Sequence, residues 1–246
     1  MLRDRLINDR WIEERKGRYG NVEPIVTLTA ITAPLYDSEI VKTEEGSTQK
    51  FGFLLGDSEE LPARSAAISY GSQILDREKA LRLNKLLLHK GHHTPMESVQ
   101  LNFLIENISK ACSAQMSRHR IGTGHVSSSR RYQNQKAAFV YPILEDINDV
   151  LLANEVYDDI ERVFKESMEA YLQLRDLGIK KGDARYCIPA ASATHRHMWI
   201  NVRALRNFFD LRLVPEAEAE IRRVACMMFD LCNQVLPSLF GDMEVM

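Results

Sequence analysis

The chain has 246 residues, 45% of them hydrophobic, which is enough for one domain with its own core. Its 32 basic and 34 acidic residues give a net charge of −2, so neither a nucleic-acid-coating basic protein nor an acidic disordered chain is indicated. No stretch reaches the roughly 20 apolar residues that cross a bilayer, and residues 1–10 are rich in charge. We therefore expect a cytoplasmic protein without membrane contact.

The first half of the chain alternates short strands with helices. Its β-branched runs favour strands, and its leucine spacing followed by Gly91 favours a helix with a glycine cap. We expect an N-terminal arm over 1–22, a strand over 24–32, a surface loop or hairpin over 37–50, helices over 61–72 and 73–90, and a strand over 99–105. Because no linker follows, residues 23–246 are expected to form a single catalytic domain.

Helices dominate the second half. Apolar residues recur at helical spacing from Val150 to Leu177, and Gly178 closes this long amphipathic helix. We also expect a helix from the cap Ser109 to about Arg118, a short one from Asp183, one from about Thr194 to Leu211, and a last one that starts at Pro215. With the two strands sharing one sheet, the fold class is α/β, in the sense of α+β.

Residues 115–135 form the most unusual segment. Four arginines, Arg118, Arg120, Arg130 and Arg131, lie within fourteen positions among hydroxyls and two glycines. Guanidinium groups pair with phosphate oxygens, and glycine lets the backbone approach a ligand, so the segment indicates an anionic ligand. A solvated basic loop explains the composition equally well.

Several classes of site are not supported. The chain has no G-x-G-x-x-G, no P-loop and no G-x-S-x-G elbow. The histidine pairs at 92–93 and at 195 and 197 lack nearby carboxylates or cysteines at zinc spacing, and the four cysteines form no C-x-x-C pair. We therefore expect no metal and no disulfide framework, with the thiols acting as small buried hydrophobic groups.

Four blocks in order resemble the flavin-dependent thymidylate synthases, the ThyX family. Arg118-His119-Arg120 followed by Ser-x-Arg-Tyr at 129–132 is similar to the family signature, and Gly91-His-His-Thr-Pro-Met-Glu97 is similar to an earlier block. Gln115 stands three residues before the signature, and a late block runs from Ala184-Arg185 through Asn201-x-Arg203 to Leu211-Arg212. The resemblance covers about residues 62–236.

The resemblance implies a thymidylate synthase-complementing fold, with a small mixed or antiparallel sheet packed with long helices, and a homotetramer whose active sites combine several subunits. It implies FAD as cofactor, with NADPH and methylenetetrahydrofolate as co-substrates. The residues that it places at FAD are Ser69, His92, Thr94, Glu97, Arg118, His119, Arg120, Ile121, Asn201, Arg203 and Asn207. Those that it places at dUMP are Gln115, Arg118, Ser129, Arg131, Arg185 and Arg212.

The implied reaction is the synthesis of dTMP from dUMP. The classical route to dTMP uses a cysteine nucleophile that normally has Pro before it and His after it, and no cysteine here has those neighbours. Flavin as hydride donor removes the need for a cysteine nucleophile. Arg212 near the uracil ring would stabilise the negative charge that develops there. Ser129 is favoured as a ligand over a covalent nucleophile, since no His/Asp pair is evident to activate it.

Three alternatives stay open. The same scaffold could act on another pyrimidine nucleotide or give a hydroxymethyl product. The segment Arg118–Arg131 could instead serve a nucleic-acid-binding module, against which the near-neutral charge argues, or the protein could bind flavin without catalysis. The signature also permits two registers, Ser128 with Arg130 or Ser129 with Arg131, and we prefer the second because it keeps Tyr132 in the motif.

Overall fold

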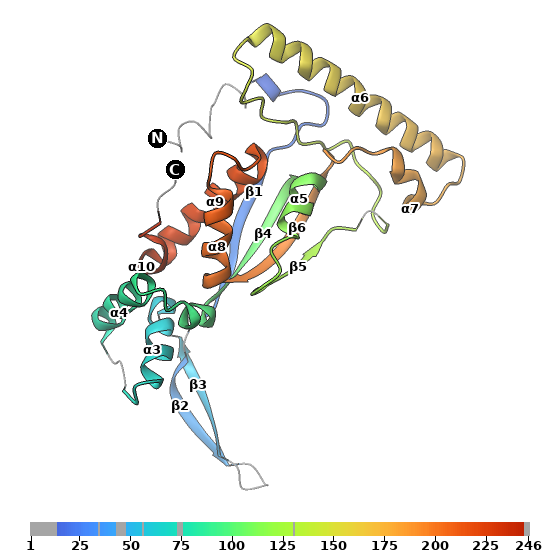
Figure 1. The fold of residues 1–246 in the computed structure, drawn as a ribbon. Helices are drawn as coiled ribbons and strands as arrows, with labels where there is room; N and C mark the ends of the chain where they lie inside the picture. Colours follow the sequence, from blue (N-terminus) through green and yellow to red (C-terminus); the bar gives the residue numbers. More distant parts are fainter. Residues whose placement is uncertain are drawn as a thin grey trace.

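A computed structural model describes residues 14–33, 35–42, 48–55, 57–72, 76–129 and 131–243. Its centre is a four-stranded antiparallel sheet in the order β1-β4-β6-β5 (Figure 1). The strands are β1 (Ile25–Ile31), β4 (Gln100–Ser109), β5 (Thr123–Ser127) and β6 (Ala193–Asn201). The strands expected over 24–32 and 99–105 are confirmed, and they pair with each other.

The segment expected as a loop or hairpin is a hairpin. β2 (Leu35–Lys42) pairs antiparallel with β3 (Thr48–Leu55), and the two form a sheet of their own.

One prediction about the second half is wrong. Residues 193–201, expected as the start of a helix, form β6, and only α8 (Val202–Arg212) is helical. Buried Thr194, Arg196, Met198 and Ile200 alternate with exposed or partly exposed neighbours. β4 pairs with one edge of β6 and β5 with the other. The backbone groups of β6 therefore make their hydrogen bonds to neighbouring strands rather than within a helix.

The other helices follow their sequence signals closely. The side chain of Ser109 caps α5 by accepting a 2.9 Å hydrogen bond from the amide of Cys112, and Gly91 and Gly178 take positive φ angles after α4 and α6. The last long helix starts at Ala219 rather than at Pro215, because residues 213–218 form turns instead. The helices are α3 (Leu61–Ile68), α4 (Arg77–His89), α5 (Lys110–Met116), α6 (Val150–Asp176), α7 (Lys181–Ala184), α9 (Ala219–Val235) and α10 (Pro237–Phe240), with 3-10 turns η1 (Ser58–Glu60), η2 (Thr94–Ser98) and η3 (Arg185–Cys187).

Two hydrophobic clusters hold these elements together. The larger one packs inward side chains of β4 and β6, such as Phe103 and Met198, against α5, α8 and α9. The smaller one packs α6 on residues 139–147, with the rings of Phe139 and Phe164 stacked at 4.3 Å. Figure 1 shows α6 at the opposite end of the molecule from α4.

Residues 14–22 lie on this second cluster. Arg15 is buried and donates to the carbonyl oxygen of Tyr141 at 2.9 Å, while Arg18 pairs with Asp158 on α6 at 2.8 Å. Residues 1–13 of the expected arm lie outside the described residues, and the division at residue 22 stays a prediction. None of the helices in the described ranges is long and apolar enough for a membrane crossing.

Candidate active site

The segment that begins with Arg118-His119-Arg120, which we call the signature segment, connects helix α5 to the edge of the central sheet. Arg118 and His119 follow the end of α5, the chain turns at Gly122, and residues 123–127 run as β5 along β6. Part of the segment is therefore a hydrogen-bonded strand rather than a solvated loop. Two cavities of similar size lie along it.

The first, which we call cavity A, has a volume of about 770 Å³. It collects eight of the expected FAD residues together with Arg212. Its lining is Glu97, Arg118, His119, Arg120, Ile121, Gly122, Thr123, Asn201, Arg203, Ala204, Asn207, Leu211 and Arg212. The remaining three expected FAD residues, Ser69, His92 and Thr94, are exposed and lie outside this lining, just after α3 and around the start of η2. Cavity A thus brings together residues that are up to 115 positions apart, from Glu97 to Arg212.

Gly122 and Asn201 shape the floor of cavity A. The amide of Asn201 donates to the carbonyl oxygen of Gly122 at 2.9 Å, and Gly122 has a φ of +68°. A Cβ at residue 122 would lie 2.5 Å from Nδ2 of Asn201, so only glycine fits without displacing that side chain. Asn201 also caps α8, because its side chain accepts a 2.8 Å hydrogen bond from the amide of Ala204.

The electrostatics of cavity A are dominated by arginine. Four guanidinium groups line it against one carboxylate, Glu97, and that carboxylate pairs with Arg203 at 2.6 Å. Nε of Arg212 donates to Nε2 of His119 at 3.2 Å, and the edge of the His119 ring packs on Phe208. Burial, and then the charge of Arg212, lower the pKa of His119, so its ring stays neutral and accepts. Such an arrangement suits an anionic ligand.

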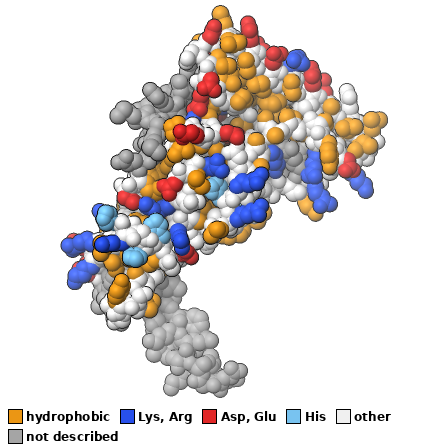
Figure 2. Space-filling view, in the orientation of Figure 1, with side chains coloured by type: hydrophobic (Ala, Val, Ile, Leu, Met, Phe, Trp, Pro, Cys, Tyr) orange, Lys and Arg blue, Asp and Glu red, His pale blue; other side chains and the backbone are white. Residues whose placement is uncertain are grey.

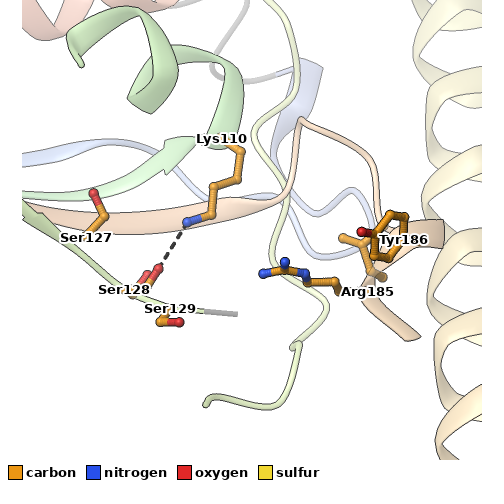
Figure 3. Close-up of a pocket in the computed structure, with 7 residues that line it drawn as sticks. Lys110, Ser127, Ser128, Ser129, Arg185 and Tyr186 are labelled. Carbon is orange, nitrogen blue, oxygen red and sulfur yellow. Dashed lines mark hydrogen bonds between the residues drawn. The ribbon is translucent and has the colours of Figure 1, made fainter. Parts of the chain in front are cut away.

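The second cavity, cavity B, has a volume of about 740 Å³ and lies at the far end of β5. Figure 3 shows Lys110 and Ser128 on one wall and Arg185 reaching into the same space from the other. Its lining is Lys110, Ser127, Ser128, Ser129, Arg185, Tyr186 and Ile188. A third cavity of about 510 Å³ shares Arg185 and Tyr186 with it and includes Arg131 and Tyr132.

The expected dUMP residues are divided between these cavities. Ser129, Arg131 and Arg185 lie at cavity B and its neighbour, whereas Arg118 and Arg212 line cavity A. Gln115 lies on α5, and its buried Oε1 has no hydrogen-bond partner among the described residues. Within one chain, the residues expected at the uracil ring and those expected at the phosphate line separate cavities.

The structure bears on the two registers of the signature. The hydroxyl of Ser128 is 2.7 Å from that of Thr194 and accepts a 3.3 Å hydrogen bond from the amide of His195. The hydroxyl of Ser129 accepts from the amide of Arg131 at 3.3 Å, within the same short turn. Ser128 is therefore tied into the sheet, which favours Ser129 as the residue that meets a ligand. Arg130 lies outside the described residues, and the register stays a prediction.

Sequence reasoning missed Lys110, Thr194 and Tyr186. Nζ of Lys110 donates to Oγ1 of Thr194 at 2.7 Å and to the carbonyl oxygen of Ser128 at 3.1 Å. No local spacing pairs Lys110 with a threonine 84 positions later, and the expected helix over residue 194 obscured the contact. Tyr186 is 85% exposed and follows Arg185, a position that nothing in the sequence marked.

No cluster of three or more His, Cys, Asp or Glu side chains is placed to hold a metal ion within the described ranges. The four cysteines are free; Cys112 and Cys232 are buried, and Cys187 and Cys226 are partly buried. Burial raises the pKa of Cys226 to about 11 and raises the pKa of Cys112 and Cys232 further, which keeps all three as thiols.

Comparison with known proteins identifies the family. The sequence model of the thymidylate synthase complementing proteins matches residues 54–238. The chain belongs to this family. A flavin-dependent thymidylate synthase from Nitratidesulfovibrio vulgaris is 32% identical over 170 residues, which is 68% of this chain and 69% of the relative. A protein of the same name from Thermosipho africanus is 29% identical over 199 residues, which is 76% of this chain and 86% of the relative.

The solved structures of the UMP/dUMP methylase PolB from Streptomyces cacaoi share the fold. The structure with bound 5-Br UMP superposes with a TM-score of 0.72 at 20% identity and covers 91% of this chain and 95% of PolB. Family membership confirms the fold class, the enzyme class of flavin-dependent thymidylate synthase and the FAD cofactor that the motifs predicted. The homotetramer and the roles of single residues stay predictions.

Proposed function

We propose that this thymidylate synthase complementing protein methylates dUMP to dTMP, with methylenetetrahydrofolate as the one-carbon donor and NADPH-reduced FAD as the source of hydride. The observation that carries the proposal is cavity A, where eight of the expected FAD residues and Arg212 surround one space of about 770 Å³. They come from η2, the end of α5, the turn at Gly122 and α8, so the grouping arises only in the folded chain.

The residues of cavity A fit a dinucleotide flavin. A pyrophosphate is held by cations and by backbone that can approach it closely. Arg118 and Arg120 supply the cations, and the turn at Gly122 supplies the backbone. Asn201 and Asn207 offer amides to polar ring or ribose groups. When bound, FAD supplies the hydride that reduces the one-carbon unit to a methyl group.

The pyrimidine nucleotide is assigned to two groups of residues. Arg185, Arg131 and the hydroxyl of Ser129 hold its phosphate, and Arg212 donates to the uracil carbonyl oxygens. Arg212 stabilises the negative charge that grows on the ring as carbon five becomes nucleophilic, and neutral His119 holds its guanidinium in place. The hydroxyl of Ser129 binds rather than attacks, since no base is bonded to it among the described residues.

A shared active site reconciles these assignments with the separation of the two cavities. We assign the complete site to a homotetramer, in which cavity A of one subunit meets cavity B of another. This arrangement predicts that an Arg212→Ala variant and an Arg185→Ala variant, each inactive alone, regain activity when the two are mixed and reassembled. Mixed tetramers without any activity would contradict the shared site.

The first test is flavin binding. The purified protein is loaded with FAD, desalted, and reduced with NADPH without oxygen, in the presence and absence of dUMP. We expect retained flavin whose rate of reduction responds to dUMP, and, once methylenetetrahydrofolate is added as the one-carbon donor, a methylated product by mass spectrometry. A folded protein that retains no flavin would overturn the proposal, and salt-dependent binding of nucleic acid by residues 118–131 would then be tested.

A second candidate is the same chemistry on another pyrimidine nucleotide or with a hydroxymethyl product. The observation that favours testing it is the structural match to PolB, which was solved with 5-Br UMP and, in another structure, with 5-Br dUMP. Parallel reactions with UMP, dUMP and dCMP, each followed by the mass of the product, separate these outcomes. A preference for UMP would replace dUMP as the substrate while leaving the flavin assignment intact.

A further inference from the structure

Arg196 is a buried cation that has no carboxylate partner among the described residues. It lies on β6 with 3% of its surface exposed, and its Nη2 donates to the carbonyl oxygen and hydroxyl of Ser113, at 2.6 and 2.9 Å, and to the hydroxyl of Ser117 at 2.7 Å. Its Nε and Nη1 are buried and make no hydrogen bond within the described part of the chain. Burial lowers the pKa of Arg196. An unbalanced buried charge is costly, so its position calls for an explanation.

That position is directly behind cavity B. Arg196 stands opposite Ser127 in the pairing of β6 with β5, and Ser127 lines the cavity. Thr194, two residues earlier on the same face of β6, is also buried and bonds Lys110 and Ser128. Figure 3 shows the side chain of Lys110 extended toward Ser128 at the cavity wall. Lys110 is therefore a cation of the cavity wall opposite Arg185, and Arg196 is a buried cation on the strand that pairs with that wall.

Among the described residues, the lining of cavity B carries no opposing charge. It includes Lys110, Arg185 and three consecutive serines but no acidic residue. The hydroxyls of Ser127 and Ser129 and two cationic side chains supply donors to an oxyanion, and the buried Arg196 adds charge from a place where water screens it little. Such a site favours a ligand with two negative charges close together.

We infer that Lys110 and Arg196 supply a second layer of positive charge to cavity B and make it selective for a phosphate monoester in its doubly charged form. The inference rests on the proposed function, in that the ligand is the 5′-phosphate of the pyrimidine nucleotide. Neither Lys110 nor Arg196 is one of the motif positions that pointed to the family. Lys110 acts at the cavity wall, whereas Arg196 acts through the electric field of its buried charge.

The test measures binding to the FAD-loaded protein of three ligands that differ in charge: dUMP, its phosphate methyl ester and deoxyuridine. We expect Lys110→Gln to weaken dUMP binding by about tenfold or more, the methyl ester less, and deoxyuridine not at all. Lys85→Gln, which removes an exposed lysine of α4 that lines neither cavity, is the matched control and should bind all three ligands like the wild type.

Arg196 gives a second, independent measurement. Because its charge is unbalanced without ligand, Arg196→Met should raise the melting temperature of the ligand-free protein while weakening dUMP binding several-fold. A residue with only a structural role would lower both. Arg196→Lys, which keeps the charge, should preserve most of the preference for dUMP over its methyl ester.

The outcomes separate the inference from the proposed function. Wild-type dUMP affinity in Lys110→Gln and Arg196→Met would overturn the inference and leave the proposed function standing. An equal loss of affinity for deoxyuridine and dUMP would show a structural role and overturn it too. A flavin-loaded wild type that binds none of the three ligands would instead refute the proposed substrate.

Discussion

Nε of Arg212 lies 3.2 Å from Nε2 of His119, which joins the last turn of α8 to the signature segment 93 residues earlier in the chain. Guanidinium nitrogens only donate, so the ring nitrogen must accept and His119 must be neutral at this atom. The contact gives the middle residue of the Arg-His-Arg run a role of its own. His119 holds the guanidinium that we assign to the uracil ring, and it does so from within the lining of cavity A.

Replacing His119 tests this positioning role. We expect His119→Phe to lower the turnover of dUMP by about ten- to a hundredfold, because Arg212 loses its partly buried acceptor while the packing on Phe208 is kept. His119→Gln places an amide oxygen near the position of Nε2 and should recover much of the activity. The measurement is kcat and KM for both variants, with flavin content determined in parallel. Equal activity of the Phe and Gln variants would contradict the role.

The same contact predicts a dependence of stability on pH. Burial and the charge of Arg212 lower the pKa of His119 below its usual value of 6.5, so the unfolded chain binds a proton more readily than the folded chain. The stabilisation is therefore complete above about pH 6.5 and is lost as the pH falls through the folded pKa. His125, whose pKa is lowered by burial and by Arg196, acts in the same direction.

The measurement is the free energy of unfolding by denaturant at several pH values below 7. The wild type should lose stability on acidification more steeply than His119→Gln, and the variant with His125→Asn added should show a still weaker dependence. Parallel curves for the three proteins would show that neither histidine contributes.

Gly122 offers a test of the geometry of cavity A. We expect Gly122→Ala to lower the free energy of unfolding by about 1–3 kcal/mol, since its φ of +68° disfavours a side chain and the new Cβ would lie 2.5 Å from Asn201. Gly178→Ala is the matched control, because Gly178 has a φ of +82° but no atom within 4 Å of the new Cβ.

The difference between the two variants reports the contact with Asn201 alone. Flavin retention should fall for Gly122→Ala and stay at the wild-type level for Gly178→Ala. If both variants lose stability equally and both retain flavin, the Gly122–Asn201 contact does not shape the cavity.

The sequence predicted those elements whose signals are local. Ser109 and Gly178 mark the start of α5 and the end of α6, and each acts within a few residues of its own position. β6 was not predicted because two of its inward residues, Thr194 and Arg196, are polar. The sequence therefore lacks the alternation of apolar residues that indicates a strand. Their burial depends on serines and a lysine of α5, which the chain brings there only after folding.

The candidate site shows the same difference between local sequence signals and contacts that form only in the folded chain. Arg118, Arg203 and Arg212 all line cavity A, while their assignment to FAD and to dUMP stays a prediction. The distribution of the dUMP residues over two cavities was not visible in the motifs, since these give the order of residues along the chain and not the distances between them. Lys110 was not predicted as a site residue for the same reason, because its distance from Thr194 and Ser128 cannot be read from the order of residues along the chain.

Asn201 combines a structural and a binding role that one pair of variants separates. Asn201→Ala removes the cap of α8 and should lower the free energy of unfolding by about 1 kcal/mol. Asn201→Asp keeps an acceptor for the amide of Ala204 and should change stability by less than about 0.5 kcal/mol, because Asp caps as well as Asn. The aspartate nevertheless places a negative charge in the lining of cavity A, where we assign the anionic flavin, and FAD retention should drop. Denaturant unfolding and flavin absorbance after desalting measure the two effects, and undiminished FAD retention in the Asp variant would place the flavin away from Asn201.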